Sequence, residues 1–198
     1  MISFLTLKNL NIIEDVENLI NNADNSANWE DGKVGYQDTL KNYRDCKDFK
    51  LDFIKTPKNE FEEKYTKVWH NAYQAQMPAV YDYCSFHNIK MEYWELMNFI
   101  KYVPGQHFQE HADHGWSYVC TVSLVAYPND DYEGGELYFP KLGVKIKPKA
   151  EDLYIFPSTY LFSHVAMPVT SGTKYSVVTM LDYNENAHTP AFHNGRHD

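Results

Sequence analysis

The sequence predicts a mainly β fold with flanking helices, an α+β sandwich or jelly roll with helices at its N-terminal end. From Lys90 onward, the apolar residues alternate with a period near two, in short runs. Turn-forming residues such as Pro128-Asn129-Asp130 and Gly134-Gly135 separate these runs. Before Lys90, the apolar residues recur at intervals of three or four, which is typical of helices. Many short strands with this spacing are typical of a sandwich or jelly roll.

The composition favours one protein domain over residues 1–198. A chain of this length can bury a sizeable core, and no linker-like segment divides it. Eighteen Lys and Arg residues against 27 Asp and Glu residues give a net charge of -9, which argues against nucleic-acid binding. Three cysteines without a Cys-x-x-Cys pair indicate a reducing compartment. We expect no secretory leader and no contact with a membrane, and therefore a cytoplasmic location.

Residues 1–89 are expected to form a helical support region. A first helix is predicted over 12–20, where apolar residues have helical spacing and acidic residues occupy the first turn. A second helix is predicted over about 57–86, with Thr56 as its N-cap and a proline at its first position. Pro78 is expected to kink or split this second helix.

Residues 90–183 are expected to form the jelly-roll core, and residues 184–198 a C-terminal tail. A strand or strand pair is predicted over 90–102, followed by a turn at Val103-Pro104-Gly105. The further predicted strands are 108–114, 118–127, 136–139, 144–146, 152–156, 163–167 and 174–183.

The segment His111-Ala112-Asp113 carries two candidate metal ligands. In an extended strand, residues two apart point to the same face, so the imidazole and the carboxylate would lie side by side. His164, in another predicted strand, is the best candidate for a third ligand. Two histidines and one carboxylate leave coordination positions open, which is typical of non-haem Fe(II) oxygenases. By the same parity, His107 can also face inward.

Further motifs occur in a fixed order around these residues. They are Tyr102-x-x-Gly105, Gly134-Gly135-Glu136-Leu137-Tyr138-Phe139 and Gly172-x-Lys174-Tyr175. Together with the histidine motifs they resemble the prolyl 4-hydroxylase branch of the 2-oxoglutarate/Fe(II) dioxygenases, over roughly residues 90–183. The resemblance implies a double-stranded β-helix, a cupin-like jelly roll with N-terminal buttressing helices.

The resemblance also implies the cofactors and the residues that hold them. It implies Fe(II), 2-oxoglutarate as cosubstrate, O2 and ascorbate. His111, Asp113 and His164 would bind the metal, and Lys174 would bind the distal carboxylate of 2-oxoglutarate. An inward lysine is costly to bury unless an anion binds beside it, which agrees with this role. The remaining candidates for cosubstrate contact are Tyr102, Tyr127 and Ser176.

Candidate substrate contacts are Trp116, Tyr118, Glu110 and His107. The sequence departs from the prolyl 4-hydroxylase pattern on this side of the site. Tyr118 stands where the family often has an arginine, and the tryptophan often found after the lysine is absent from Val177-Val178-Thr179-Met180. These departures leave the metal and 2-oxoglutarate motifs intact.

The expected function is hydroxylation of a peptidyl prolyl residue, in a peptide or protein partner, with oxidative decarboxylation of 2-oxoglutarate to succinate and CO2. One alternative is the same chemistry on a different residue or a small molecule. A second alternative is a non-catalytic jelly-roll binding module, which would be free to lose one of the four key residues. A cupin-type metal isomerase would need no cation ten residues beyond the last ligand, so Lys174 argues against it.

Overall fold

The structure, a computed structural model, describes residues 2–7, 10, 12–21, 28–34, 39–115 and 119–184. Most of its strands belong to two antiparallel sheets. The major sheet is formed, in spatial order, by β1 (Ser3–Thr6), β12 (Asp152–Pro157), β8 (Val122–Ala126), β15 (Lys174–Asp182), β6 (Met97–Tyr102), β4 (Lys47–Leu51) and β2 (Glu30–Asp31), with β5 (Tyr93–Trp94) paired to β15. The minor sheet is formed by β11 (Val144–Ile146), β10 (Leu137–Phe139), β13 (His164–Ala166), β7 (His107–His111) and β3 (Arg44–Asp45).

Three smaller features complete the description of the secondary structure. Strands β9 (Glu133–Gly134) and β14 (Val169–Ser171) form a separate pair. Two 3₁₀ turns, η1 (Pro140–Leu142) and η2 (Tyr160–Phe162), follow β10 and precede β13. Within the described ranges, no helix is both long and apolar enough to cross a membrane.

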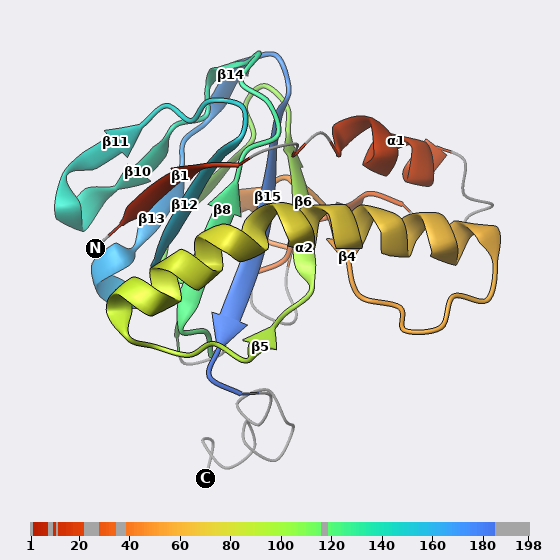
Figure 1. The fold of residues 1–198 in the computed structure, drawn as a ribbon. Helices are drawn as coiled ribbons and strands as arrows, with labels where there is room; N and C mark the ends of the chain where they lie inside the picture. Colours follow the sequence, from red (N-terminus) through yellow and green to blue (C-terminus); the bar gives the residue numbers. More distant parts are fainter. Residues whose placement is uncertain are drawn as a thin grey trace, which may run out of the picture.

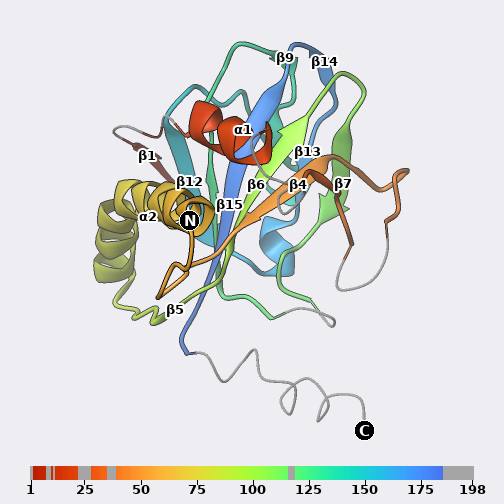
Figure 2. The same ribbon diagram turned by 90° about the vertical axis from the view of Figure 1, so that its right-hand side faces the viewer.

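The two helices cover the face of the major sheet that points away from the minor sheet. Helix α1 (Ile13–Asn21) and helix α2 (Glu60–His87) lie on one side of this sheet, and β7 and β13 lie on the other (Figures 1 and 2). The main apolar core lies under the helices and includes Val16, Val68 and Leu124. A second apolar cluster, which includes Val125 and Phe139, joins the two sheets. The predicted N-terminal buttressing helices are therefore confirmed.

Strand β15 shows how the sequence divides these two layers. Tyr175, Val177 and Leu181 belong to the core under the helices. The residues that alternate with this set, Lys174, Ser176, Val178 and Met180, line a cavity between the sheets. This alternation follows from the period of two in an extended strand, which places neighbouring side chains on opposite faces.

Residues 1–89 also contribute strands that the sequence did not predict. Strands β4 and β2 extend the major sheet beyond β6, β1 adds to its other edge, and β3 pairs with β7. These strands have between two and five residues, and β2, β3 and β4 contain many charged side chains, so the apolar pattern is too short to detect. The N-terminal region is therefore part of both sheets and not only a helical support.

Helix α2 begins three residues later than predicted. Asn59, not Thr56, is its N-cap, and the Asn59 side-chain oxygen accepts a hydrogen bond from the Glu62 N–H at 2.9 Å. The Glu62 carboxylate in turn accepts a bond from the Lys58 N–H at 2.7 Å, a reciprocal arrangement close to a capping box. Pro78 lies inside the helix and does not split it.

We expect Asn59→Ala to lower the free energy of unfolding by about 1 kcal/mol, because the N-terminal N–H groups of the helix lose a side-chain acceptor. Thr56→Ala is the matched control and should leave stability within about 0.5 kcal/mol of wild type. Urea unfolding monitored by circular dichroism measures both values. Equal losses in the two variants would contradict the assignment of the cap to Asn59.

Candidate functional site

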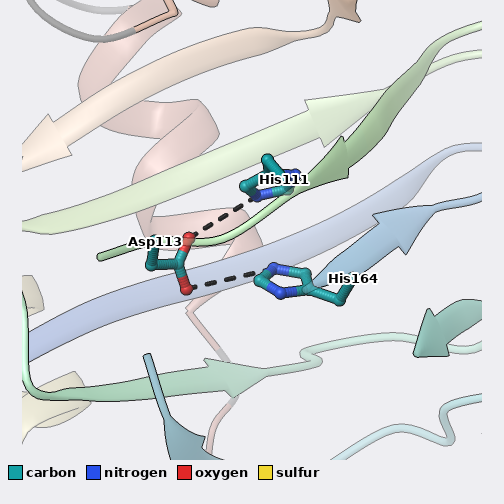
Figure 3. A group of neighbouring side chains, drawn as sticks. All are labelled: His111, Asp113 and His164. Atoms are coloured by element: carbon teal, nitrogen blue, oxygen red, sulfur yellow. Dashed lines mark ion pairs between the residues drawn. The ribbon is translucent and has the colours of Figure 1, made fainter. Parts of the chain in front are cut away.

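Strands β7 and β13 bring His111, Asp113 and His164 together between the sheets (Figure 3). His111 pairs directly with His164 across the two strands, and Asp113 lies in the bend that follows β7. His111 Nε2 is 3.5 Å from Asp113 Oδ1, and His164 Nε2 is 3.9 Å from Asp113 Oδ2. The potential ligand atoms of the three residues all lie within 4.8 Å of one another.

Both imidazoles are oriented for metal binding through Nε2. The Nδ1 atom of His111 lies 2.8 Å from the Gln109 carbonyl oxygen, and that of His164 lies 3.2 Å from the Phe162 carbonyl oxygen. A carbonyl oxygen only accepts, so each Nδ1 donates its hydrogen and each Nε2 keeps a free lone pair. The cluster, with two nitrogen donors and one carboxylate oxygen, therefore fits an Fe(II) ion.

A β-bulge in β7 determines which side chains lie on the same face of the strand as His111. Between the pairs His111–His164 and Phe108–Ala166, β7 advances three residues while β13 advances two. The extra residue places Phe108 and His111 on the same face, and their rings stack with centroids 3.5 Å apart. His107 was expected to face inward because residues an even number apart in a regular strand share a face, and this rule does not apply across the bulge.

The charges within the cluster are balanced for metal binding. Burial raises the pKa of Asp113, but the two imidazoles and the Ser123 hydroxyl outweigh burial and hold that pKa well below its usual range. Burial and the neighbouring His111 lower the pKa of His164 to about 4. At neutral pH, Asp113 is therefore ionised and His164 is neutral, which are the forms that bind a metal ion.

The cluster opens into a cavity of about 560 Å³ between the two sheets. Alternate residues of three major-sheet strands line one wall: Asn98, Ile100 and Tyr102 of β6, Val125 and Tyr127 around β8, and Lys174, Ser176, Val178 and Met180 of β15. Leu137 and Ala166 of the minor sheet face them. The apolar side chains of this wall alternate with polar ones, and charged residues such as Asp48 and Glu95 also line the cavity.

Lys174 is buried in the wall of this cavity, with only 2% of its surface exposed. Its ammonium donates a hydrogen bond to the Gly135 carbonyl oxygen at 2.7 Å. The ammonium also lies 5.2 Å from the ring centre of Tyr102 and 5.3 Å from that of Tyr127, which is within range of cation–π attraction. In the part of the chain that the structure describes, Lys174 forms no salt bridge with a carboxylate.

Gly135 makes room for the lysine. Its φ is +65°, and a Cβ atom there would lie 3.0 Å from Lys174 Cδ and 3.0 Å from Tyr132 Cε2. The neighbouring Gly134 also has a positive φ, of +68°. Glycine tolerates this conformation and this close approach better than other residues.

The other predicted cosubstrate contacts surround Lys174. Tyr102, Tyr127 and Ser176 are buried and line the cavity. Tyr102 is the direct partner of Lys174 across β6 and β15. Burial, followed by the electrostatic influence of Cys46, raises the pKa of the Tyr102 hydroxyl, so this group is a neutral hydrogen-bond donor.

Of the four predicted substrate contacts, two lie outside the cavity and two fall on residues that the structure does not describe. Glu110 does not line the cavity; its carboxylate accepts bonds from Lys141 at 2.9 Å and Ser163 at 2.6 Å outside it. His107 also does not line the cavity, and Phe108 lies there instead. The predictions for Trp116 and Tyr118 fall outside the residues that the structure describes.

Sequence reasoning missed two polar groups that lie close to the cluster. Ser123 donates a hydrogen bond to Asp113 Oδ2 at 2.5 Å. Arg44, from the unpredicted strand β3, lines the cavity and lies 4.9 Å from the centre of the Phe108 ring, and its Nη2 donates to both carboxylate oxygens of Asp48 at 2.8 Å. Neither residue belongs to a local motif, because each reaches the site only through sheet pairing.

Comparisons with known proteins agree with this arrangement. Residues 97–181 match the 2OG-Fe(II) oxygenase superfamily model. A candidate prolyl 4-hydroxylase of Acanthamoeba polyphaga mimivirus is 29% identical over 120 residues, which are 50% of this chain and 49% of that protein. A PKHD-type hydroxylase of Colwellia psychrerythraea is 42% identical over 65 residues, which are 32% of this chain and 27% of that protein. The chain thus spans half or less of the length of these relatives.

Solved structures with the same fold extend over nearly the whole chain. A Trichoplax adhaerens prolyl hydroxylase, solved with a hypoxia inducible factor peptide fragment, has a TM-score of 0.68 and 16% identity, and the match covers 91% of this chain and 82% of that one. A Pseudomonas putida prolyl-4-hydroxylase has a TM-score of 0.60 and 18% identity, with 91% of each chain covered. These matches confirm the predicted double-stranded β-helix. Residues 97–181 are thus similar to the 2-oxoglutarate/Fe(II) oxygenase superfamily, and the chain shares its fold with solved prolyl hydroxylases.

Proposed function

We propose that the protein is a 2-oxoglutarate- and Fe(II)-dependent dioxygenase that hydroxylates a peptidyl prolyl residue. His111, Asp113 and His164 are the proposed metal ligands. Bound Fe(II) would supply the activation of O2, with 2-oxoglutarate converted to succinate and CO2 and one oxygen atom transferred to the substrate. Ascorbate is proposed as a supporting reductant, from the family resemblance alone.

The single observation that carries this proposal is the buried Lys174. An ammonium removed from water and not paired with a carboxylate is unfavourable, so a site of this kind is expected to receive an anion. Lys174 lines the same cavity as the His-Asp-His cluster. The charge of Lys174 contributes to lowering the pKa of His164, so the ammonium lies within electrostatic range of a proposed metal ligand.

This arrangement suits a ligand with an acidic group at each end. One end of 2-oxoglutarate would lie at the metal, and its distal carboxylate would accept hydrogen bonds from Lys174. The hydroxyl groups of Tyr102, Tyr127 and Ser176 are the proposed additional donors, because all three residues line the cavity near Lys174. Val125, Leu137 and Val178 supply apolar surface that excludes water from the ligand.

A peptide or protein is the proposed substrate. Support comes from the Trichoplax adhaerens relative, which was solved with a peptide fragment. His107, Trp116, Tyr118 and Glu110 remain proposed substrate contacts; of these, Glu110 is exposed close to His111 in sequence and bonded to Lys141 and Ser163. We also propose a reducing, cytoplasmic setting, which agrees with the free thiols of Cys46, Cys84 and Cys120.

The proposal is tested with the purified protein, Fe(II), 2-oxoglutarate, ascorbate and a panel of proline-containing peptides in air. We expect succinate to form and one peptide to gain a single oxygen atom by mass spectrometry. The same peptide with alanine in place of proline, and the His164→Ala variant, should give no hydroxylated product. Hydroxylation of a residue other than proline would contradict the substrate assignment, and an absence of succinate with every peptide would contradict the activity.

Lys174→Ala should weaken 2-oxoglutarate binding by at least about tenfold, because a hydrogen bond to a charged group contributes roughly 1.5–3 kcal/mol. Metal binding should change by less than about threefold, because Lys174 is not a proposed ligand. Isothermal titration calorimetry with Co(II), then with 2-oxoglutarate at saturating metal, separates the two effects. Lys145→Ala is the control, since Lys145 lies exposed on β11, away from the cavity. Equal losses of metal and 2-oxoglutarate in Lys174→Ala would contradict the role of Lys174.

Without 2-oxoglutarate, stability should depend on pH through Lys174. Burial and the nearby charge of Lys147 lower the pKa of Lys174 from 10.5 to about 7. Between these two values the unfolded chain binds a proton that the folded chain does not, so the contribution of Lys174 to stability rises with pH from about 7 toward 10.5. Urea unfolding between pH 7 and 9.5 should therefore show a steeper rise for wild type than for Lys174→Met. Parallel curves would show that Lys174 is not buried as described.

A further inference from the structure

A chain of buried hydrogen bonds leads from the Asp113 carboxylate into the major sheet. Ser123 Oγ lies 2.5 Å from Asp113 Oδ2, and Ser158 Oγ lies 2.7 Å from Ser123 Oγ. Cys120 Sγ lies 2.8 Å from Ser158 Oγ. Cys120, Ser123 and Ser158 expose 1% of their surface or less, so bulk water does not compete for these bonds.

The acceptor at one end of this chain determines the direction of its bonds. An ionised carboxylate only accepts hydrogen bonds, so the Ser123 hydroxyl must donate its hydrogen to Asp113. The Ser123 oxygen is then left to accept from Ser158, and the Ser158 oxygen to accept from the Cys120 thiol. The thiol step is the weakest, because Cys120 Sγ also lies 3.2 Å from Met180 Sδ and 3.6 Å from the Val122 carbonyl oxygen.

The same residues hold the backbone around Asp113. The His114 N–H donates to the Ser158 carbonyl oxygen at 2.9 Å, and His114 Nδ1 lies 2.7 Å from the Cys120 carbonyl oxygen. The Ser158 N–H donates to the Thr121 carbonyl oxygen at 3.0 Å. The bend after β7 is thus attached to the major sheet through its backbone as well as through the Asp113 side chain.

We propose that Cys120, Ser158 and Ser123 form a one-directional hydrogen-bond relay that positions Asp113 for metal binding. Ser123 occupies Oδ2, which leaves Oδ1, 3.5 Å from His111 Nε2, as the ligand atom. Buried bonds that point the same way polarise one another, so the relay also makes the orientation of the carboxylate more rigid. This proposal rests on the proposed function, because it assigns a role toward the same metal site.

The test is Co(II) binding by calorimetry, with the visible absorption of bound Co(II) as a second readout. Ser123→Ala should weaken Co(II) binding by about tenfold, which is typical of losing a partner that orients a metal ligand. It should also change the Co(II) absorption band. Ser123→Thr keeps the hydroxyl and should restore affinity to within about threefold of wild type. The matched control is Thr179→Val, which removes a buried hydroxyl that donates to Gln76 on the helix side of β15.

The outcomes separate the relay from the metal site itself. If wild type binds Co(II) and Ser123→Ala binds it equally well, the relay is wrong and the metal site stands. If Thr179→Val loses as much affinity as Ser123→Ala, the effect is one of general stability and the relay is also wrong. A wild-type protein that binds no Co(II) overturns the metal site and the relay together. If Ser123→Ala does not fold, Ser158→Ala decides, with an expected loss of about threefold and an unchanged affinity as the contrary result.

Discussion

The burial of the Lys174 ammonium between two sheets is the constraint on which the rest of the site depends. A cation removed from water must be balanced by carbonyl oxygens, aromatic faces or an anion. The structure supplies the first two through Gly135, Tyr102 and Tyr127. These groups contact the ammonium, and Lys174 still lines the cavity. Their arrangement explains why a lysine can occupy a position that an apolar residue would fill in an ordinary sandwich.

The metal end of the cavity depends on both sheets. The minor sheet brings His111 and His164 together as direct strand partners, and the bulge in β7 adds Phe108 behind His111. The major sheet supplies Ser123 and holds the Asp113 carboxylate from the other side. Because the three proposed ligands are held from opposite layers, their separation depends on the packing of the whole sandwich and not on one local loop.

Much of the fold and of the site could be predicted from the sequence, because the period of two persists through the longer strands. Lys174, Ser176 and Tyr102 lie on the cavity face, as expected. The expectation that His107 shares a face with His111 was wrong, because one extra residue in β7 reverses which side chains point to the cavity. No residue type in the sequence marks the position of this bulge. Strands β1 to β4 and the contacts of Ser123 were missed because they depend on pairing between distant segments. The cap at Asn59 was present in the sequence as Asn59-x-x-Glu62, but a proline nearby gave a competing signal.

The paired glycines have a consequence for the tolerance of this protein to change. Gly134 and Gly135 resemble an ordinary surface turn, where many substitutions are accepted. In this fold, however, a methyl group on Gly135 would meet both the Lys174 stem and the Tyr132 ring, and one on Gly134 would meet the Pro168 carbonyl oxygen at 2.4 Å. Engineering that aims to shorten, stiffen or diversify this loop would therefore alter the surroundings of Lys174 first. At Gly143 a Cβ atom would meet nothing within 4 Å, but its φ of +64° still favours glycine, so the exposed Leu142 beside it is a better position for a tag or label.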